Sequence, residues 1–392
     1  MPDSTVVSAF LTESHVALAA RITAYAAREI AALPEPADDT AGRTQARDLV
    51  ARLGRAGWFA SIGELDLRAA CLVRETLAGA SPLADAMFAL QALGTVPILL
   101  AGDAPLKERW LPGVLAGRAI ASFAMTEPEA GSDAAAIATT ARRDGASYVL
   151  RGTKTLISNA GIADFYTVFA STDRGKGNKG ISAFVVAADT PGLKFVRPLV
   201  LSAPHPLGEI AFEDCRVPAS DRLGAEGEGF KLGLATLDRL RATVAAATCG
   251  MAARALHEAV AHATRRRQFG HTLSEFQLIQ EKLARMATDL TAARLLTYRA
   301  AWEKDRGADR VTLEAAMAKA FATEAAQRIV DDAVQILGGR GVLASHPVDR
   351  LYRAVRALRI YEGTTEIQHL IVAGQLLKQA GGEGGGDGGD AA

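Results

Sequence analysis

The most suggestive chemical group in this sequence is a single carboxylate, Glu362, near the C-terminal end. It follows the apolar and aromatic residues Ile360 and Tyr361 and precedes Gly363, and Thr364 can start the next helix. A carboxylate in apolar surroundings has a raised pKa, because its charged form loses hydration. A raised pKa suits a general base that removes a weakly acidic proton near neutral pH. A lone Glu is more often a loop residue in water, so this interpretation depends on the rest of the chain.

The composition is that of an ordinary globular protein. A chain of 392 residues, 49% of them apolar, allows two or three domains, and no apolar stretch is expected to cross a membrane. Lys+Arg and Asp+Glu are equal at 44 each, which gives no net field to attract nucleic acid. The three cysteines and the histidines lack ligand spacing, so neither a disulfide framework nor a metal site is expected. The start, through Glu13, has no signal-peptide pattern, and a cytoplasmic location is expected.

The residue patterns predict a multidomain α+β protein. Residues 1–119 show helix-spaced apolar positions, and 120–228 hold short β-type runs separated by turns, which predict an antiparallel barrel or sandwich. Long periodic segments over 229–379 predict a four-helix bundle. The glycine-rich tail, 380–392, is expected to be disordered.

One sequence match is misleading. Residues 175–180 read G-x-G-x-x-G, but a strand is predicted on both sides of them. A dinucleotide-binding turn needs a helix after the glycines. We interpret this segment as a hairpin loop.

Five separated segments carry a family resemblance. They are Phe123–Asp133, Thr155–Gly161, Arg265–Gly270, Gln335–Gly341 and Tyr361–Thr365. In this order and approximate spacing they resemble the acyl-CoA dehydrogenase family, from about Leu11 to Leu377. The resemblance implies FAD between the sheet and the bundle, a homotetramer or homodimer, and an electron-transferring flavoprotein as the electron acceptor. The implied reaction is the α,β-desaturation of an acyl-CoA thioester.

The resemblance gives Glu362 the role of the catalytic base. The α-proton would go to Glu362 and the β-hydrogen, as hydride, to flavin N5. The backbone N–H of Glu362 and a flavin ribityl hydroxyl would polarise the thioester carbonyl. Some relatives carry the base on a bundle helix instead, just before the arginine that corresponds to Arg241. Leu240 occupies that position here, so Glu362 is the one candidate.

The resemblance also assigns cofactor and substrate residues. The expected FAD-binding residues are Met125, Thr126, Ser132, Ile157, Ser158, Arg266, Phe269, Gln335, Gly338, Gly339, Thr364 and Glu366. Ser158 would lie near flavin N5, and Arg266 would reach the FAD pyrophosphate of a neighbouring subunit. The expected substrate residues are Ser132, Asp238, Arg241 and Gly363.

Simpler explanations stay open for several of these residues. Ser132 suits a turn, Phe269 suits core packing, and Thr364 with Glu366 suits a helix cap. Asp238 and Arg241, three residues apart, suit an intrahelical ion pair.

Two departures from the family pattern lie beside the expected site. Leu156 replaces a Trp that covers the flavin edge in relatives, and Leu201–Gly208 replaces a loop that contacts CoA or substrate. His205, between two prolines of that loop, is interpreted as a surface histidine, with recognition of an unusual acyl group as the alternative.

Other functions stay open on the same fold. One is oxidation of an acyl group on a carrier protein, and another is transfer of electrons to oxygen. A non-enzymatic DNA-binding relative is disfavoured by the balanced charge.

Overall fold

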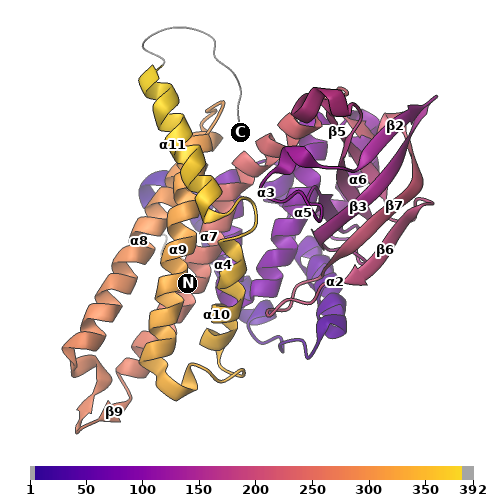
Figure 1. Ribbon diagram of the computed structural model, residues 1–392. Coiled ribbons are helices and arrows are strands. Elements are labelled where there is room, and N and C mark those ends of the chain that lie inside the picture. Colours follow the sequence, from indigo (N-terminus) through magenta and orange to yellow (C-terminus); the bar gives the residue numbers. More distant parts are fainter. Residues whose placement is uncertain (1–4, 382–392) are drawn as a thin grey trace.

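The computed structural model describes residues 5–381, and it runs from helices through a sheet to helices again (Figure 1). The fold class expected from the sequence is confirmed. The first helices are α1 (Glu13–Tyr25), α2 (Asp39–Arg55), α3 (Ala60–Gly63), α4 (Leu67–Ala80), α5 (Pro82–Ala101) and α6 (Ala104–Leu115).

Side-chain caps fix where most of these helices begin. Asp38, Asp66, Ser81 and Asp103 precede α2, α4, α5 and α6, and each accepts a hydrogen bond from a backbone N–H in the first turn. Such caps satisfy N–H groups that have no partner within the helix.

The middle region forms one sheet, which is largely antiparallel. Its strands are β1 (Ala121–Ala124), β2 (Thr140–Asp144), β3 (Ser147–Ser158), β4 (Phe165–Ser171), β5 (Ile181–Ala187), β6 (Leu193–Pro198), β7 (Leu207–Pro218) and β8 (Arg222–Leu223). The order is β6-β7-β3-β2-β4-β5-β8, and β1 lies beside β4. The β1–β4 and β2–β4 contacts are parallel, so the sheet is mixed where the sequence predicted only antiparallel pairs.

The segment with the coincidental glycine pattern joins two of these strands. Residues 174–180 form a short turn between β4 and β5, which pair antiparallel along their whole length. The hairpin interpretation is confirmed.

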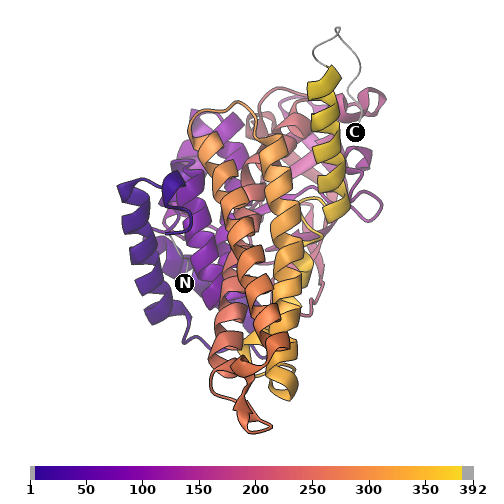
Figure 2. The same cartoon turned by 90° about the vertical axis from the view of Figure 1, so that its left-hand side faces the viewer.

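The C-terminal region contains three long helices, and two shorter helices together occupy the fourth position of the bundle. The helices are α7 (Gly229–Ala263), α8 (Gln277–Asp305), α9 (Thr312–Leu337), α10 (Pro347–Leu358) and α11 (Thr365–Gly381). Figure 2 shows the long helices side by side, with α11 at the far end from the α7–α8 connection. A small hairpin, β9 (Arg267–Gln268) and β10 (His271–Thr272), makes that connection. The fourth arm of the bundle is α10 and α11, which are separated by the turn that carries Glu362.

Helix α5 corrects one expectation. By length and composition it could cross a membrane, whereas no such stretch was expected from the sequence. Of its most apolar window, 72% is buried inside the protein, where α5 contacts α2, α4, α7 and β1. It is a core helix that joins the N-terminal helices to the sheet and the bundle.

Candidate active site

Glu362 lies in a strained turn that several side chains hold in place. Its φ is +54°, in the left-handed region, which non-glycine residues adopt at a cost of about 1–3 kcal/mol. Gln368 Nε2 donates to the carbonyl oxygens of Glu362 and Gly363, at 3.1 Å each. Lys319 Nζ from α9 donates to the carbonyl of Gly363 at 2.6 Å. These contacts from two helices fix the direction in which the Glu362 side chain points.

The carboxylate of Glu362 is buried beside cations but is not fully hydrogen-bonded. Its Oε2 has no hydrogen-bond partner among residues 5–381. Burial raises the pKa of Glu362, and the charges of Arg74, Lys319 and Arg241 partly oppose this rise. The guanidinium of Arg74 binds both oxygens of Asp85, at 2.8 and 2.9 Å, so much of its charge is already compensated. The result is a desolvated carboxylate with a free acceptor atom, as a general base requires.

Asp238 and Arg241 lie on the N-terminal half of α7. Arg241 Nη1 donates to Asp238 at 2.5 Å, so the intrahelical ion pair exists. Thr312 donates to the other carboxylate oxygen of Asp238 at 2.6 Å. Arg241 Nε lies 3.4 Å from the carbonyl oxygen of Glu362 and donates to it. The pair therefore joins α7 to the Glu362 turn, and its contact with substrate remains a prediction.

A buried ion pair supports the Met125–Thr126 segment. Lys154 Nζ, which is fully buried, donates to the carbonyl of Met125 at 2.9 Å and to Glu127 Oε1 at 2.7 Å. Burial lowers the pKa of Lys154 to about 8, although the Glu127 charge opposes the shift. Burial alone would raise the pKa of Glu127, but the Lys154 charge and hydrogen bonds from Lys154, Thr139 and Ala138 hold it below its usual value. This pair fixes the backbone that the sequence assigns to the flavin ring.

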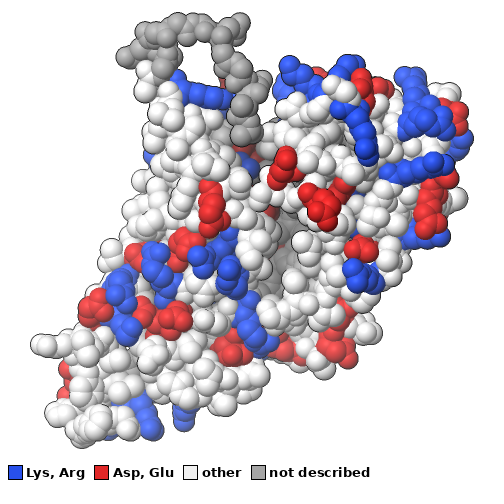
Figure 3. Space-filling model, viewed as in Figure 1, with Lys and Arg blue, Asp and Glu red and all other residues white. Residues whose placement is uncertain are grey.

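The Met125 segment and the Glu362 turn lie against the same helix. A Cβ on Gly233 of α7 would come within 2.4 Å of Met125 Cε, so the Met125 side chain packs directly against this helix. Arg241, which contacts the Glu362 turn, follows eight residues later, about 12 Å along the helix axis. The space-filling view shows a hollow between the bundle and the sheet (Figure 3).

The end of β3 shows a correction and an exposed leucine. His205 was interpreted as a surface histidine, but it is half-buried and its Nε2 lies 2.8 Å from Ser158 Oγ. Ile157 is buried, whereas Leu156 has a φ of +55° and is 55% exposed. Ser132 is exposed on the loop after β1.

Thr364 and Glu366 begin the helix after the Glu362 turn. Thr364 Oγ1 accepts a hydrogen bond from the backbone N–H of Ile367 at 3.3 Å, which confirms the capping interpretation for this residue. Glu366 is exposed in the first turn of α11. Their contacts with FAD remain predictions.

The other predicted cofactor residues lie at the opposite end of the bundle. The end of α7, Ala263, is about 33 Å along the axis from Arg241. Burial and the charges of Arg340 and Arg266 lower the pKa of His262, which shows that the ends of α7 and α9 are close together. We call the exposed residues there the bundle-end patch; they are Arg266, Phe269, Gln335, Gly338 and Gly339.

The bundle-end patch is open enough for a ligand. Phe269 is 91% exposed, so the core-packing alternative for this residue is wrong. No atom lies within 4 Å of a Cβ built on Gly338 or Gly339, which leaves their backbone accessible. An exposed guanidinium, an aromatic ring and bare glycine backbone suit the pyrophosphate and adenosine portions of FAD. Their contact with FAD remains a prediction.

Two cationic residues beside Glu362, Arg74 and Lys319, were not predicted from the sequence, and His205 was predicted at the surface. Arg74 follows Leu72 and Val73, and Lys319 lies in an Ala-rich helix, so each is a charge in an apolar run. A charged side chain on the buried face of a helix is rare unless it is paired. A charge within an apolar run therefore could have indicated a buried partner for each residue.

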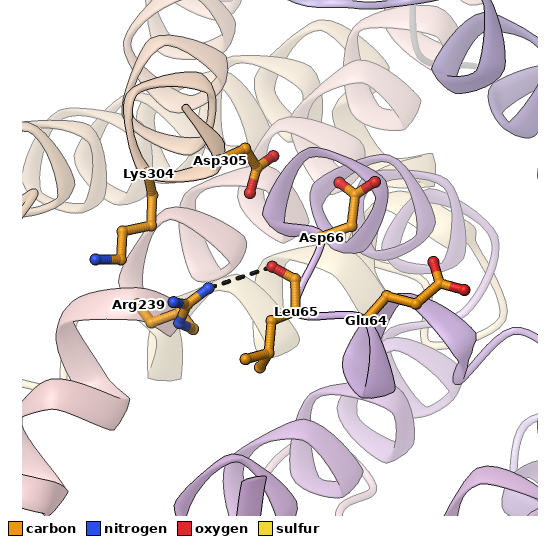
Figure 4. Close-up of a pocket in the computed structure, with 6 residues that line it drawn as sticks. All are labelled: Glu64, Leu65, Asp66, Arg239, Lys304 and Asp305. Atoms are coloured by element: carbon orange, nitrogen blue, oxygen red, sulfur yellow. Dashed lines mark hydrogen bonds between the residues drawn. The ribbon is translucent and has the colours of Figure 1, made fainter. Parts of the chain in front are cut away.

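A separate cavity lies near α3, the N-terminal third of α7 and the C-terminal end of α8. Its volume is about 340 Å³, and it is lined by Glu64, Leu65, Asp66, Arg239, Lys304 and Asp305 (Figure 4). Asp66 and Asp305 accept backbone N–H groups from the first turn of α4 and so serve as helix caps. None of the six was assigned to a site. Within residues 5–381, no group of three or more His, Cys, Asp or Glu side chains could hold a metal ion.

Known proteins are similar to this chain over nearly its whole length. Models of the N-terminal, middle and C-terminal domains of acyl-CoA dehydrogenases match residues 12–118, 122–215 and 227–377. A 3-(aryl)acrylate reductase of Clostridium sporogenes is 40% identical over 380 residues, which cover 94% of this chain and 100% of the relative. A probable acyl-CoA dehydrogenase of Mycobacterium leprae is 39% identical over 378 residues, 94% of this chain and 96% of the relative.

Solved structures are also similar over nearly the whole chain. Butyryl-CoA dehydrogenase from Megasphaera elsdenii has a TM-score of 0.87 and 35% identity, covering 94% of this chain and 99% of its own. An FAD complex of PigA has a TM-score of 0.86 and 29% identity, with coverage of 94% and 99%. A chain described with the electron transferring flavoprotein of Acidaminococcus fermentans has a TM-score of 0.89 and 36% identity, with the same coverage. The chain belongs to the acyl-CoA dehydrogenase family, and it is an FAD-dependent oxidoreductase that acts on the CH–CH bonds of acyl-CoA.

Proposed function

We propose that Glu362 is the general base that removes the α-proton from an acyl-CoA thioester. The observation that carries this proposal is the Oε2 atom, which is buried without a hydrogen-bond partner in the described part of the chain. Burial raises the pKa of this carboxyl group, and the charges of Arg74, Lys319 and Arg241 partly oppose this rise. A raised pKa makes the carboxylate a stronger base.

The residues around Glu362 would orient the thioester. FAD, when bound, supplies the acceptor for the β-hydride at N5. Met125, Thr126, Ile157 and Ser158 would hold its ring from the sheet side. Gln368, Lys319 and Arg241 bind the carbonyls of Glu362 and Gly363 and so keep the turn rigid.

Substrate and cofactor contacts beyond the ring follow from the same assignment. Ser132, Asp238, Arg241 and Gly363 would line the thioester and CoA path. Thr364 and Glu366 would contact the FAD diphosphate and adenosine side.

We also propose that a second copy of the chain completes the FAD site. The bundle-end patch is exposed and lies about 33 Å along the axis of α7 from Arg241, which contacts the Glu362 turn, and this separation supports a homodimer or homotetramer. An electron-transferring flavoprotein is the proposed electron acceptor, in line with the similarity to the Acidaminococcus fermentans chain. A cytoplasmic location is part of the same proposal.

Anaerobic bleaching of the yellow protein tests the proposed reaction. Straight, branched, aryl and cyclic acyl-CoA thioesters are mixed with the holoenzyme without oxygen, and the flavin absorbance is followed. At least one class is expected to bleach the flavin rapidly and yield its enoyl-CoA. A flavin that stays oxidised with every class, yet bleaches with acyl-carrier-protein thioesters, would favour the carrier-protein alternative. Rapid reoxidation by air would favour an oxidase.

A second candidate is the reverse reaction, the reduction of an arylacrylyl thioester. It is favoured by the 40% identity with the 3-(aryl)acrylate reductase over the full length of that relative. The same carboxyl group would then deliver a proton to the α-carbon. Reoxidation of the chemically reduced holoenzyme by arylacrylyl-CoA, faster than by a straight-chain enoyl-CoA, would identify this direction.

A further inference from the structure

The loop that departs from the family pattern is fixed at several points. Leu199, two residues before this loop, donates its N–H to the carbonyl of Leu207 at 3.0 Å, which closes the loop. Arg353 of α10 donates to the carbonyl of Ser202 at 3.1 Å. A Cβ on Gly42 of α2 would lie 3.8 Å from Pro204, an ordinary packing distance. The loop therefore contacts the sheet, the bundle and the N-terminal helices at once.

Arg43 fixes the two strand ends between which His205 lies. It donates to the carbonyl of Ala160 at 2.6 Å and to that of Leu207 at 2.5 Å. The Asn159 N–H also donates to the carbonyl of Pro206 at 2.8 Å, and Ser158 pairs with Leu207 in the sheet. The contact of 2.8 Å between His205 Nε2 and Ser158 Oγ is therefore part of a rigid arrangement.

The imidazole of His205 is neutral at physiological pH. Burial and the charge of Arg43 lower its pKa to about 4. A neutral imidazole has one nitrogen that donates and one that accepts. If Nε2 donates to Ser158 Oγ, the serine hydroxyl hydrogen is free to bond to another acceptor. If Nε2 accepts the serine hydrogen, the serine oxygen is left to accept a hydrogen bond from another group. The tautomer of His205 thus selects what the Ser158 hydroxyl presents.

We propose that His205 is a positioning residue that fixes the rotation of the Ser158 hydroxyl toward the flavin. The inference rests on the proposed function, which places Ser158 near flavin N5. Nothing in the family resemblance assigns a role to this histidine, because the loop that carries it replaces the family's own sequence. Through the Ser158 hydroxyl, His205 would change the relative stability of oxidised and reduced flavin.

Four variants of the holoenzyme test the proposal. They are His205→Leu, which removes the contact; His205→Gln, which keeps a donor and an acceptor at the reach of Nε2; Ser158→Ala; and the double variant His205→Leu/Ser158→Ala. His257→Leu, on the exposed face of α7, is the control. The visible spectrum and the midpoint potential of the bound flavin are measured, and thermal unfolding checks the fold.

We expect His205→Leu to change the ratio of oxidised to reduced flavin at a fixed potential by about fivefold, the equivalent of one net hydrogen bond. Ser158→Ala should shift it in the same direction, and the double variant should shift no further than Ser158→Ala. His205→Gln should retain most of the wild-type potential, and His257→Leu all of it.

Two results would overturn the proposal. One is an unchanged potential in a folded His205→Leu protein. The other is a His205→Leu shift that is equally large when Ser158 is already Ala, since His205 would then act without the hydroxyl. The potential shift caused by His205→Leu can depend on Ser158 even if no acyl-CoA bleaches the wild-type flavin. In that case the proposed reaction fails while the role of His205 stands.

Discussion

The Glu362 turn and the bundle-end patch differ in almost every physical respect. The Glu362 turn is strained and half-buried, it places its carboxylate oxygen Oε2 in the interior, and it is held by side chains of its own chain. The bundle-end patch is exposed, with an aromatic ring in solvent and open space above its glycines. Both carry sequence segments of the same family.

This difference separates two tasks of one enzyme. The proton transfer that we propose at Glu362 needs a dry, preorganised environment, which a single folded chain can supply. The FAD contact that we propose at the bundle-end patch would be completed by a second copy of the chain, because the length of α7 separates this patch from the Glu362 turn of its own chain. Mutations in the turn should therefore change reaction rates or folding, and mutations in the patch should change FAD retention.

The largest effect is expected from Glu362→Gln. The amide cannot take a proton, so flavin reduction by acyl-CoA should fall by about 10²–10⁴-fold while FAD binding and folding persist. Stopped-flow absorbance under anaerobic conditions measures this rate. Glu281→Gln, an exposed residue of α8, is the control. Near-normal turnover of Glu362→Gln would remove the assigned base.

Lys154→Met should destabilise the fold next most strongly. It leaves Glu127 as a buried charge without its cation, which costs about 3–5 kcal/mol in the free energy of unfolding. Denaturant unfolding measures this cost. Adding Glu127→Gln should restore part of it, and Lys194→Met, in an exposed ion pair with Glu213, should cost at most about 1 kcal/mol. Equal small effects of both lysine variants would contradict the role given to the buried pair.

Arg266→Ala should weaken FAD retention without affecting the stability of the isolated chain. A charge-assisted contact with a pyrophosphate corresponds to about 10- to 100-fold in the FAD dissociation constant. Flavin content after gel filtration reports it. The control is Arg265→Ala, whose side chain already bonds to the carbonyl of Ala261 in its own helix. Unchanged flavin content in Arg266→Ala would count against the shared site.

The smallest of these effects is a pH shift in Lys319→Met. The Lys319 charge lowers the pKa of Glu362, so its removal should raise that pKa further. The base acts in its charged form, and the acid limb of kcat/KM should therefore move to higher pH. Loss of the Lys319 contact with Gly363 can lower the maximum value of kcat/KM. The pH at which kcat/KM falls on the acid side is measured independently of that maximum. Lys282→Met, which removes a cation paired with Asp332, should leave the limb in place. A limb that moves to lower pH would contradict the assignment.

The sequence predicted the parts of this molecule that local patterns encode. The order of helices and strands follows from periodicity, and Glu362 was identified from its apolar neighbours and the family segments. The position of His205 could not be predicted, because it depends on the pairing of Ser158 with Leu207 and on Arg43 from a distant helix. Arg74 and Lys319 were missed for a related reason: their partners, Asp85 and Gly363, are brought to them only by the packing of other helices.

Exchange of the α-hydrogen with solvent tests the central claim most directly, because it isolates proton removal from hydride transfer. The holoenzyme is incubated anaerobically in D₂O with an acyl-CoA that bleaches the flavin, and deuterium at the α-carbon is followed by NMR. The account predicts enzyme-dependent exchange in the wild type and loss of that exchange in Glu362→Gln with its flavin still bound. Exchange at the wild-type rate in Glu362→Gln would show that another group takes the proton.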